Sequence, residues 1–463
     1  MSGSELNLQG MKVLVLGAGR SGLAAARLAR LHGAEVEVAD QAAPERLQGC
    51  ADVLAADGIR LYCAVEEWQG SAPDFAVVSP GIALESPLVR SVAATGARLY
   101  GELGFAARYC TMPIYAVTGT NGKTTTVEML TAALQAAGRK PVSCGNIGVP
   151  FSQIVMEGGD YDCAVLEVSS FQLELPEGLA VDAAAILNVT PDHLDRHGTM
   201  ENYRDIKLRL AALVRPGGTV VCTSALIPWM HCGEGAVPAA LCTAGENSVA
   251  GMTSWTVAPE GICIRTADGG ENLFIARSAL CVRGNHNLAN AAAVCAVMSA
   301  LGIPAESYRG ALGEFKCGPH RLEEVGQVGG VTYIDDSKAT DVDATRQALR
   351  TVGPAAGKHV HLIAGGLDKG CALTDVETEL RMYVKQAYLI GTCRQRLARL
   401  WEGEIPCILC ENMEDAVRKA AANAEAGDIV LLSPACASLD TFKSYAQRGE
   451  VFVAAMRALE AEQ

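Results

Sequence analysis

A glycine-rich turn with a lysine, Gly119-Thr120-Asn121-Gly122-Lys123-Thr124-Thr125, stands between an apolar run and a helical pattern. Backbone N–H groups of such a turn can surround phosphates, the Lys123 ammonium can reach β- and γ-phosphate oxygens, and the Thr124 hydroxyl can ligate Mg²⁺. The turn ends like a P-loop but is shorter, because Val117 stands where the first glycine would be. The sequence predicts an ATP site here.

A second glycine turn, Gly17-Ala18-Gly19-Arg20-Ser21-Gly22, follows an earlier apolar run, and Asp40 lies 18 residues beyond it. Glycines in this pattern let the backbone approach a pyrophosphate at a helix N-terminus, and the acid can bind a ribose hydroxyl. A dinucleotide and a UDP-sugar both satisfy the pattern, and a tight turn without a ligand is the simpler alternative. Two nucleotide sites disfavour a simple dehydrogenase, because one would bind a substrate while the other supplies energy.

Polar side chains also follow further apolar runs in the middle of the chain. Glu167 ends one of them, where a carboxylate suits Mg²⁺ but could equally cap the surface. The segment Asp192–His197 holds two Asp, two His and one Arg, which favours a site over a solvated loop. Lys207 follows on a predicted helix, where its spacing alone indicates a surface lysine. Asn287 and Asn290 lie one helical turn apart, so both could face a ligand, or Asn287 could cap the helix.

Three predicted strand-end loops in the last third of the chain carry cations or hydroxyls. They are 335–341 with Lys338 and Thr340, 365–370 with Lys369, and 433–440 with Ser433. Loops at the carboxyl ends of parallel strands meet at one edge of a sheet. We therefore expect these side chains to bind a substrate that bears a carboxylate.

The elements that must position these residues alternate between β-type apolar runs and helical patterns, which is typical of α/β architecture with parallel sheets. At about 150 residues per domain, the chain corresponds to about three domains. We predict α/β domains at 1–111, 112–316 and 317–463. The strands that follow from the apolar runs are 11–16, 36–39, 75–78, 98–100, 114–117, 163–167, 183–187, 331–334, 360–364, 387–390 and 429–432.

Composition narrows the function further. The net charge is −14, from 38 Lys and Arg against 52 Asp and Glu, which disfavours broad nucleic-acid binding. No secretory leader pattern and no apolar run of about 18 residues is visible, so we expect a cytoplasmic protein without a membrane span.

The 17 cysteines are scattered along the chain. The Cys407-Ile408-Leu409-Cys410 spacing on a strand points the two sulfurs to opposite faces, which disfavours a zinc knuckle.

With these residues assembled, the sequence resembles the Mur ligases, which add amino acids to the cytoplasmic peptidoglycan precursor. The resemblance rests on both glycine turns, Ser79-Pro80-Gly81-Ile82, Glu167–Leu173, Asp192–His197, His286-Asn287 with Asn290, and the C-terminal loops. Asp336–Thr340 and Ser433–Asp440, continued by Phe442 and Arg448-Gly449, are similar to the branch that adds D-glutamate. The resemblance implies ATP-dependent joining of D-glutamate to UDP-N-acetylmuramoyl-L-alanine through an acyl phosphate, and we expect a monomer.

The resemblance also implies a role for each site residue, in a Rossmann-like first domain, a P-loop-type ATPase middle domain and a Rossmann-like last domain. The UDP-substrate would be bound by Gly19, Arg20, Ser21, Gly22, Asp40, Gly81, Asn146 and His193. ATP would be bound by Gly119–Thr125, Asn287, Asn290, Arg321 and Asp336. Two Mg²⁺ ions would use Thr124, Glu167, His193 and Lys207, the last as an N-carboxylated lysine. D-glutamate would be bound by Lys338, Thr340, Lys369, Ser433 and the Phe442 backbone, and Lys123, His193 and Lys207 would be catalytic.

The sequence departs from the family pattern at three places. Asp341 stands where Asn is usual, His197 stands where Tyr is usual, and the segment between His193 and Lys207 is one residue shorter than expected.

The alternative functions are a ligase of the same fold that adds another amino acid or acts on folate, an NAD-dependent oxidoreductase, and a nucleotide sensor without turnover. The oxidoreductase leaves the turn at Lys123 unexplained, and intact Lys123, Glu167, His193 and Lys207 argue against the sensor.

Overall fold

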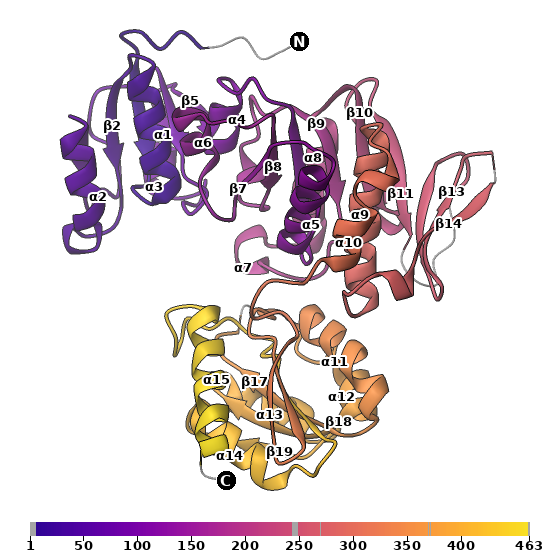
Figure 1. Ribbon diagram of the computed structural model, residues 1–463. Helices are drawn as coiled ribbons and strands as arrows, with labels where there is room; N and C mark the ends of the chain where they lie inside the picture. Colours follow the sequence, from indigo (N-terminus) through magenta and orange to yellow (C-terminus); the bar gives the residue numbers. More distant parts are fainter. Residues whose placement is uncertain (1–5, 243–248, 269, 369, 371, 462–463) are drawn as a thin grey trace. The chain divides into compact units, whose positions relative to one another are not determined.

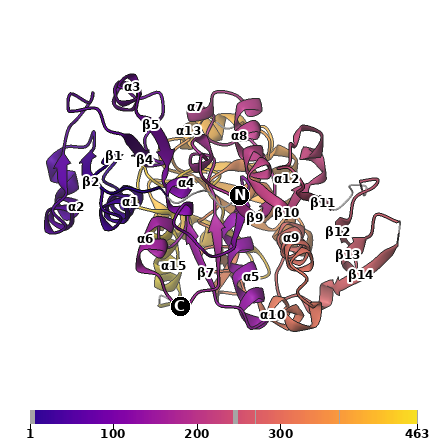
Figure 2. The same cartoon turned by 90° about the horizontal axis from the view of Figure 1, so that it is seen from above.

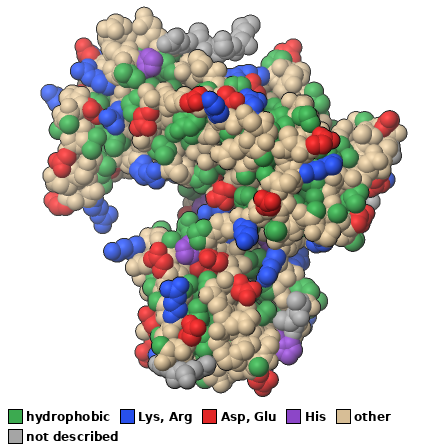
Figure 3. Space-filling view, viewed as in Figure 1, with side chains coloured by type: hydrophobic (Ala, Val, Ile, Leu, Met, Phe, Trp, Pro, Cys, Tyr) green, Lys and Arg blue, Asp and Glu red, His purple; other side chains and the backbone are tan. Residues whose placement is uncertain are grey.

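The computed structural model describes residues 6–242, 249–268, 270–368, 370 and 372–461 (Figure 1). The chain forms two compact units. The first comprises Met1–Val189, Glu201–Leu280 and Ala289–Glu314, and the second comprises Thr190–Met200, Cys281–Leu288 and Phe315–Gln463. On the face seen in Figure 3, Lys and Arg side chains are interspersed with Asp and Glu.

The first unit begins with a five-stranded parallel sheet in the order β3-β2-β1-β4-β5. Strands buried on both faces need continuous apolar runs, and β4 is buried at all four residues. The strands are β1 (Lys12–Leu16), β2 (Glu35–Ala39), β3 (Arg60–Tyr62), β4 (Phe75–Val78) and β5 (Arg98–Gly101). The helices are α1 (Arg20–Leu31), α2 (Pro44–Ala56), α3 (Pro87–Ala94) and α4 (Glu102–Ala107).

The same unit contains a nine-stranded sheet in the order β14-β13-β12-β11-β10-β9-β6-β8-β7. Strands from β7 to β12 run parallel, and β13 and β14 add an antiparallel end. The strands are β6 (Ile114–Thr118), β7 (Pro141–Gly145), β8 (Cys163–Glu167), β9 (Val181–Ile186), β10 (Val214–Thr223), β11 (Val237–Cys242), β12 (Ser254–Ala258), β13 (Gly261–Arg265) and β14 (Glu271–Ala276).

Helices α5 (Lys123–Ala136), α6 (Phe151–Glu157), α8 (Met200–Ala212) and α10 (Arg309–Glu314) accompany the nine-stranded sheet, and α9 spans Asn285–Ala300. Helix α5 packs on β6, β7 and β8. Helix α6 packs against α1 and α4, so the two sheets of this unit share a helical layer (Figure 2). Short 3-10 turns lie at Gln172–Glu174, Ser224–Trp229, Arg277–Ala279 and Ala305–Ser307.

The second unit is built on a six-stranded sheet in the order β15-β16-β20-β17-β18-β19, antiparallel only between β15 and β16. The strands are β15 (Glu323–Val328), β16 (Val331–Asp335), β17 (Val360–Gly365), β18 (Val384–Ile390), β19 (Cys407–Leu409) and β20 (Ile429–Leu432). The helices are α7 (Leu194–His197), α11 (Val342–Ala356), α12 (Glu377–Tyr383), α13 (Arg394–Trp401), α14 (Met413–Asn423) and α15 (Tyr445–Ala461).

The predicted α/β class with mainly parallel sheets is confirmed. The division into domains at 111 and 317 stays a prediction. Among the helices of the described residues, none has the length and hydropathy that crossing a bilayer requires.

A buried carboxylate anchors the start of β20 in the second unit. Asp428 is 2% exposed and accepts from Lys385 Nζ at 3.0 Å and from the Glu425 N–H at 2.9 Å. His361 Nε2 lies 3.1 Å from its Oδ2, and His359 Nδ1 lies 2.9 Å from its Oδ1. Burial alone would raise the pKa of Asp428, but these hydrogen bonds outweigh burial and lower the pKa to about 2.

Because the folded pKa lies below the ordinary value of 3.8, ionised Asp428 stabilises the fold above about pH 4, and this contribution is lost as the pH falls toward 2. We expect Asp428→Asn to lower the local unfolding free energy around β17 and β20 by about 2 kcal/mol at pH 7. Hydrogen exchange measures that energy. The control is Glu425→Gln, which removes an exposed partner of the same Lys385; equal protection in both variants would contradict the role of Asp428.

Candidate active site

The turn after β6 is held in one shape by two asparagines. Gly122 has a φ of +84°, and a Cβ there would lie 2.3 Å from Oδ1 of Asn290. A side chain is therefore excluded both by backbone conformation and by space. The Asn188 carbonyl accepts from the Thr120 N–H at 2.9 Å, and its side chain exchanges hydrogen bonds of 2.8 and 3.0 Å with the Asn121 backbone.

Two lysine ammonium groups converge on one carbonyl oxygen of this turn. Lys123 Nζ donates to the carbonyls of Gly119 and Thr120 at 2.9 and 2.7 Å. Lys207 Nζ donates to the same Gly119 carbonyl at 2.7 Å and lies 4.8 Å from the centre of the Tyr203 ring. Lys207 is 1% exposed, so the fold buries a lysine whose spacing alone indicates the surface. Two cations in so small a space create a positive potential that suits phosphate oxygens.

Glu167 ends β8 in register with Val117 of the strand that leads into this turn. Its side chain is 2% exposed, and its Oε1 accepts from Asn146 Nδ2 at 2.7 Å. Its Oε2 is buried and lacks a hydrogen-bond partner among the described residues. A buried carboxylate oxygen without a donor is costly unless a cation meets it. The position fits Mg²⁺, and Thr124, at the second residue of α5, offers a hydroxyl at the end of the neighbouring strand.

The first glycine turn is fastened to Asp40 and to the loop after β4. The two carboxylate oxygens of Asp40 accept from the N–H groups of Ala18 and Ala42, each at 2.7 Å. A Cβ on Gly22 would lie 1.8 Å from the Gly17 carbonyl oxygen, so α1 starts as close to the turn as glycine allows. Asp40 therefore shapes the turn, in addition to any contact with a ribose.

Neighbouring loops complete this edge of the first sheet. Ser79, which precedes Gly81 by two residues, donates to the Gly17 carbonyl at 3.3 Å. Arg20 donates to the carbonyl of Gly148, in the turn that also carries Asn146. These hydrogen bonds link the first glycine turn to Asp40 and to the loops of Gly81 and Asn146. The predicted UDP-substrate residues of the first unit are Gly19, Arg20, Ser21, Gly22, Asp40, Gly81 and Asn146.

The remaining predicted nucleotide residues belong to the second unit. They are His193, Asn287, Arg321 and Asp336. His193 adopts a left-handed φ of +52° before α7, and its Nε2 lies 3.3 Å from Asp192. Burial raises the pKa of Asp336 to about 7, against the hydrogen bonds that it accepts from Ser433 Oγ at 2.8 Å and the Leu322 N–H at 3.2 Å.

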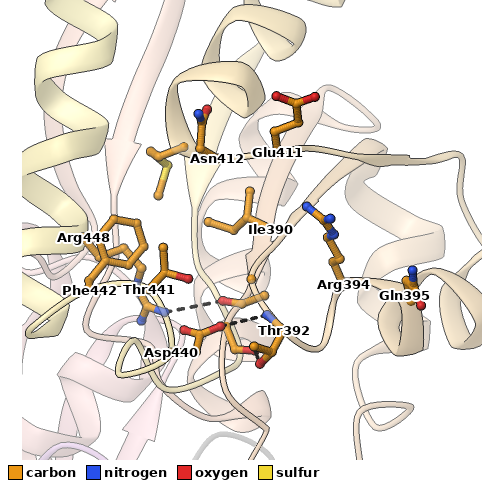
Figure 4. A pocket seen from close by; sticks show the side chains of 14 residues that line it. Ile390, Thr392, Arg394, Gln395, Glu411, Asn412, Asp440, Thr441, Phe442 and Arg448 are labelled. Carbon is orange, nitrogen blue, oxygen red and sulfur yellow. Dashed lines mark hydrogen bonds between the residues drawn. The ribbon is translucent and has the colours of Figure 1, made fainter.

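A buried guanidinium joins the three strand-end loops of the second unit. Arg448, on α15, is fully buried and donates to the carbonyls of Gly365, Cys436 and Ser337 at 3.4, 3.0 and 2.8 Å. Gly365 is the last residue of β17, and Cys436 and Ser337 lie in the loops after β20 and β16. Burial lowers the pKa of Arg448 to about 10, so it stays charged near neutrality. Figure 4 shows it beside Phe442 at a pocket of about 450 Å³. No local pattern around Arg448 indicates this role in the sequence.

The loops that Arg448 joins carry the predicted D-glutamate residues. Lys338 Nζ lies 4.9 Å from the centre of the Tyr445 ring. Ser433 is fully buried and its hydroxyl donates to Asp336, while the Phe442 N–H donates to the Ser438 carbonyl at 2.9 Å. Lys369 lies outside the described residues.

The unusual Asp341 has a local explanation. Its side chain accepts from the Ala344 N–H at 3.0 Å and caps α11. Asp and Asn are equivalent N-caps, so the exchange keeps the start of the helix intact. His197 is buried at the end of α7.

Three side chains that could ligate a metal meet at the start of β15. The ligand atoms of His320, Glu323 and Asp335 lie within 4.8 Å of one another. His320 Nδ1 already lies 2.7 Å from Asp335 Oδ2, and the His320 N–H donates to Glu323 at 2.9 Å. These hydrogen bonds account for the cluster without an ion.

Family models match most of the chain. Residues 117–298 match the Mur ligase middle domain, and residues 320–436 match the Mur ligase, glutamate ligase domain. The UDP-N-acetylmuramoylalanine--D-glutamate ligase of Acidobacterium capsulatum is 38% identical over an alignment of 457 residues, which covers 96% of this chain and 96% of its own. The enzyme of the same name from Desulfitobacterium hafniense is 37% identical over 455 residues, covering 96% of this chain and 97% of its own.

Solved structures share the fold at lower identity. MurF ligase from Thermotoga maritima in complex with ADP aligns with a TM-score of 0.59 at 17% identity, covering 98% of this chain and 96% of its own. UDP-N-acetylmuramate-alanine ligase MurC from the same organism aligns with a TM-score of 0.58 at 19% identity, covering 97% and 99%.

Gly449 leaves room for the network around Arg448. A Cβ there would lie 2.4 Å from Asp335 Oδ2 and His320 Nδ1, and 2.6 Å from Ser337 Oγ. We expect Gly449→Ala to destabilise the second unit by about 1–3 kcal/mol and to increase hydrogen exchange in residues 335–340. The control is Gly403→Ala, where no atom lies within 4 Å of the added Cβ. Unchanged exchange in Gly449→Ala would show that the loop does not depend on this close approach.

Proposed function

Because the chain belongs to the Mur ligase family, we propose that it joins D-glutamate to UDP-N-acetylmuramoyl-L-alanine at the expense of ATP, in peptidoglycan precursor synthesis. The observation that carries the proposal is the identity of 36–38% with D-glutamate ligases along nearly the whole chain. The lysines at the Gly119 turn support it, as does the Glu167 oxygen that has no hydrogen-bond partner in the described part of the chain, because a ligase of this kind must bind a triphosphate and a cation.

In this proposal ATP occupies the turn Gly119–Thr125. Lys123 offsets negative charge on the transferring phosphoryl group, and Asn287, Asn290, Arg321 and Asp336 hold the adenosine part. Thr124 and Glu167 would hold one Mg²⁺, and His193 with N-carboxylated Lys207 would hold a second. When bound, Mg²⁺ supplies charge neutralisation at the phosphates.

The reaction then runs in two steps. The carboxylate of the L-alanyl end attacks the γ-phosphorus, which forms an acyl phosphate and releases ADP. The D-glutamate amine attacks the acyl carbon, and inorganic phosphate leaves as the amide forms. Activation is needed because a carboxylate is a poor electrophile. Lys123 is placed to stabilise the anionic oxygens of the first step, since its ammonium group lies at the Gly119 and Thr120 carbonyls of the turn.

The two other substrates are assigned to the first and the last domain. The Rossmann-like first domain would bind the UDP part through Gly19–Gly22, Asp40, Gly81 and Asn146, with His193 reaching the same substrate. The last domain would bind D-glutamate through Lys338, Thr340, Lys369, Ser433 and the Phe442 backbone. In the structure the Ser433 hydroxyl donates to Asp336, which links the D-glutamate residues to the adenosine residues of the same unit. The enzyme is proposed to work as a cytoplasmic monomer.

Phosphate release tests the proposal directly. With ATP, Mg²⁺ and UDP-N-acetylmuramoyl-L-alanine, we expect release with D-glutamate and none with L-glutamate, D-aspartate, L-alanine or L-lysine. Lys123→Ala should reduce the rate by about 10²–10³ while the fold is kept, because it removes a charge that acts on the transferring group. Release with another amino acid would keep the ligase chemistry and overturn the D-glutamate assignment. Release with none, together with nicotinamide nucleotide binding, would favour an oxidoreductase.

Lys207 can be tested by chemical rescue. We expect Lys207→Ala to lose activity, and added short carboxylic acids to restore part of it, because they would replace the carboxylate of the modified lysine. Lys140→Ala is the matched control, since Lys140 is exposed and pairs with Asp160 at the surface. Full activity of Lys207→Ala without added acid would rule out the carboxylated-lysine role.

A further inference from the structure

The fold brings together two cysteines that are 43 residues apart in the sequence. Cys393 follows β18, Cys436 follows β20, and their sulfurs share a hydrogen bond of 3.3 Å. Both side chains are buried, with 6% and 1% exposed. The Cys-x-x-Cys pair of the sequence, Cys407 and Cys410, lies elsewhere on and after β19.

Backbone hydrogen bonds fix both cysteines, so their closeness does not depend on rotamers alone. The Cys393 N–H donates to the Gly366 carbonyl at 3.0 Å, and the Cys436 carbonyl accepts from Arg448 at 3.0 Å. Thr392 donates to Asp440 Oδ2 at 2.8 Å, which ties the two loops again beside the sulfurs. The pair is thus part of the frame that positions the strand-end loops of the second unit.

The two thiols differ in acidity. The hydrogen bond with Cys436 lowers the pKa of Cys393, despite its burial. The same bond and burial both raise the pKa of Cys436. Cys393 is therefore the sulfur that becomes the nucleophilic thiolate, and Cys436 is the one that resolves the intermediate.

A pocket that a small reagent can enter lies beside this pair, although neither sulfur lines it. The pocket of about 450 Å³ is lined by Thr392 and Arg394, the neighbours of Cys393 in the chain, and by Gly366, its hydrogen-bond partner. Figure 4 shows Thr392 and Asp440 joined at the base of this pocket, with Arg394 on its wall. A peroxide is small enough to enter, whereas a protein oxidoreductase is not.

We propose that Cys393 and Cys436 are a site of reversible disulfide formation that a peroxide drives, and that the disulfide weakens D-glutamate binding. The Cys393 thiolate attacks one peroxide oxygen, giving a sulfenic acid and hydroxide. The Cys436 thiol then attacks the sulfenic sulfur and loses its proton, which forms the disulfide and expels a second hydroxide that leaves as water. Two thiols and one hydrogen peroxide thus give one disulfide and two waters.

The effect on the substrate rests on the proposed function. A bonded pair is closer than 3.3 Å by about 1 Å, so at least one loop must shift. The loop of Cys436 also carries Ser433, and Arg448 transmits its position to the loop of Lys338. The nucleotide turn at Lys123 belongs to the other unit. We therefore expect the KM for D-glutamate to rise at least tenfold, and the KM for ATP, whose adenosine part is assigned to Arg321 and Asp336 of this unit, to rise by a smaller factor.

Tryptic mapping tests the bond without any assay of activity. Cleavage after Lys385, Arg394, Lys419 and Lys443 gives peptides 386–394 and 420–443, each with a single cysteine. After treatment of the full-length enzyme with hydrogen peroxide, we expect these two peptides linked, and separated again by dithiothreitol. Cys407 and Cys410 share the peptide 400–418 and serve as an internal control. Peroxide-treated protein in which Cys393 and Cys436 stay thiols, or stop at sulfenic acid, would overturn the proposal.

Kinetics of matched variants test the consequence. Cys393→Ser and Cys436→Ser should keep a low KM for D-glutamate after peroxide, whereas the Cys407→Ser/Cys410→Ser double variant should respond like the parent. If a Cys436 variant fails to fold, Cys393→Ala provides the same test from the other sulfur. A linked peptide pair with an unchanged KM for D-glutamate would overturn the regulatory effect. If the reduced enzyme does not use D-glutamate, the proposed function is refuted. The tryptic mapping still shows in that case whether the disulfide forms.

Discussion

The strand-end loops of the second unit depend on the buried charge of Arg448. The Arg448 guanidinium sits where the loops after β16, β20 and β17 come together, and it gives a hydrogen bond to a carbonyl of each. These strands are neighbours in the sheet, so their carboxyl-terminal loops are brought to one edge. Burying a guanidinium is costly, and main-chain acceptors offset that cost without tying the charge to one carboxylate. The arrangement favours a defined geometry of three loops over maximum stability.

In the first unit, cationic side chains gather at one backbone turn. Around Gly119, the ammonium groups of Lys123 and Lys207 share an oxygen, and Glu167 lies at the end of the adjacent strand. Opposite charges are thus held near one another at the ends of β6 and β8. This arrangement favours the binding of a polyanion together with a divalent cation, because each ligand neutralises the charge that the other leaves uncompensated.

Local sequence patterns were enough for eleven of the strands, the two glycine turns and the acid at a strand end, whereas the edge strands β3, β7 and β15 were not predicted. Apolar runs and glycine positions report on backbone geometry, which is decided within a few residues. The burial of Lys207 was not accessible in this way, because it depends on a contact with a carbonyl 88 residues away. The same holds for Arg448, whose acceptors lie 12, 83 and 111 residues away, and for the inward direction of the Ser433 hydroxyl. The family resemblance supplied a role for Lys207, which spacing could not.

The antiparallel end of the nine-stranded sheet has a consequence for how this enzyme can change over evolutionary time. Strands β13 and β14 lie at the edge farthest from β8, and Arg265 pairs with Glu271 across them at 2.9 Å. Charges on such an edge discourage pairing with another chain. Insertions or losses there leave the ends of β6 and β8 untouched. We expect lineages to differ most in length at this hairpin, which also makes its turn a suitable place to graft a reporter tag.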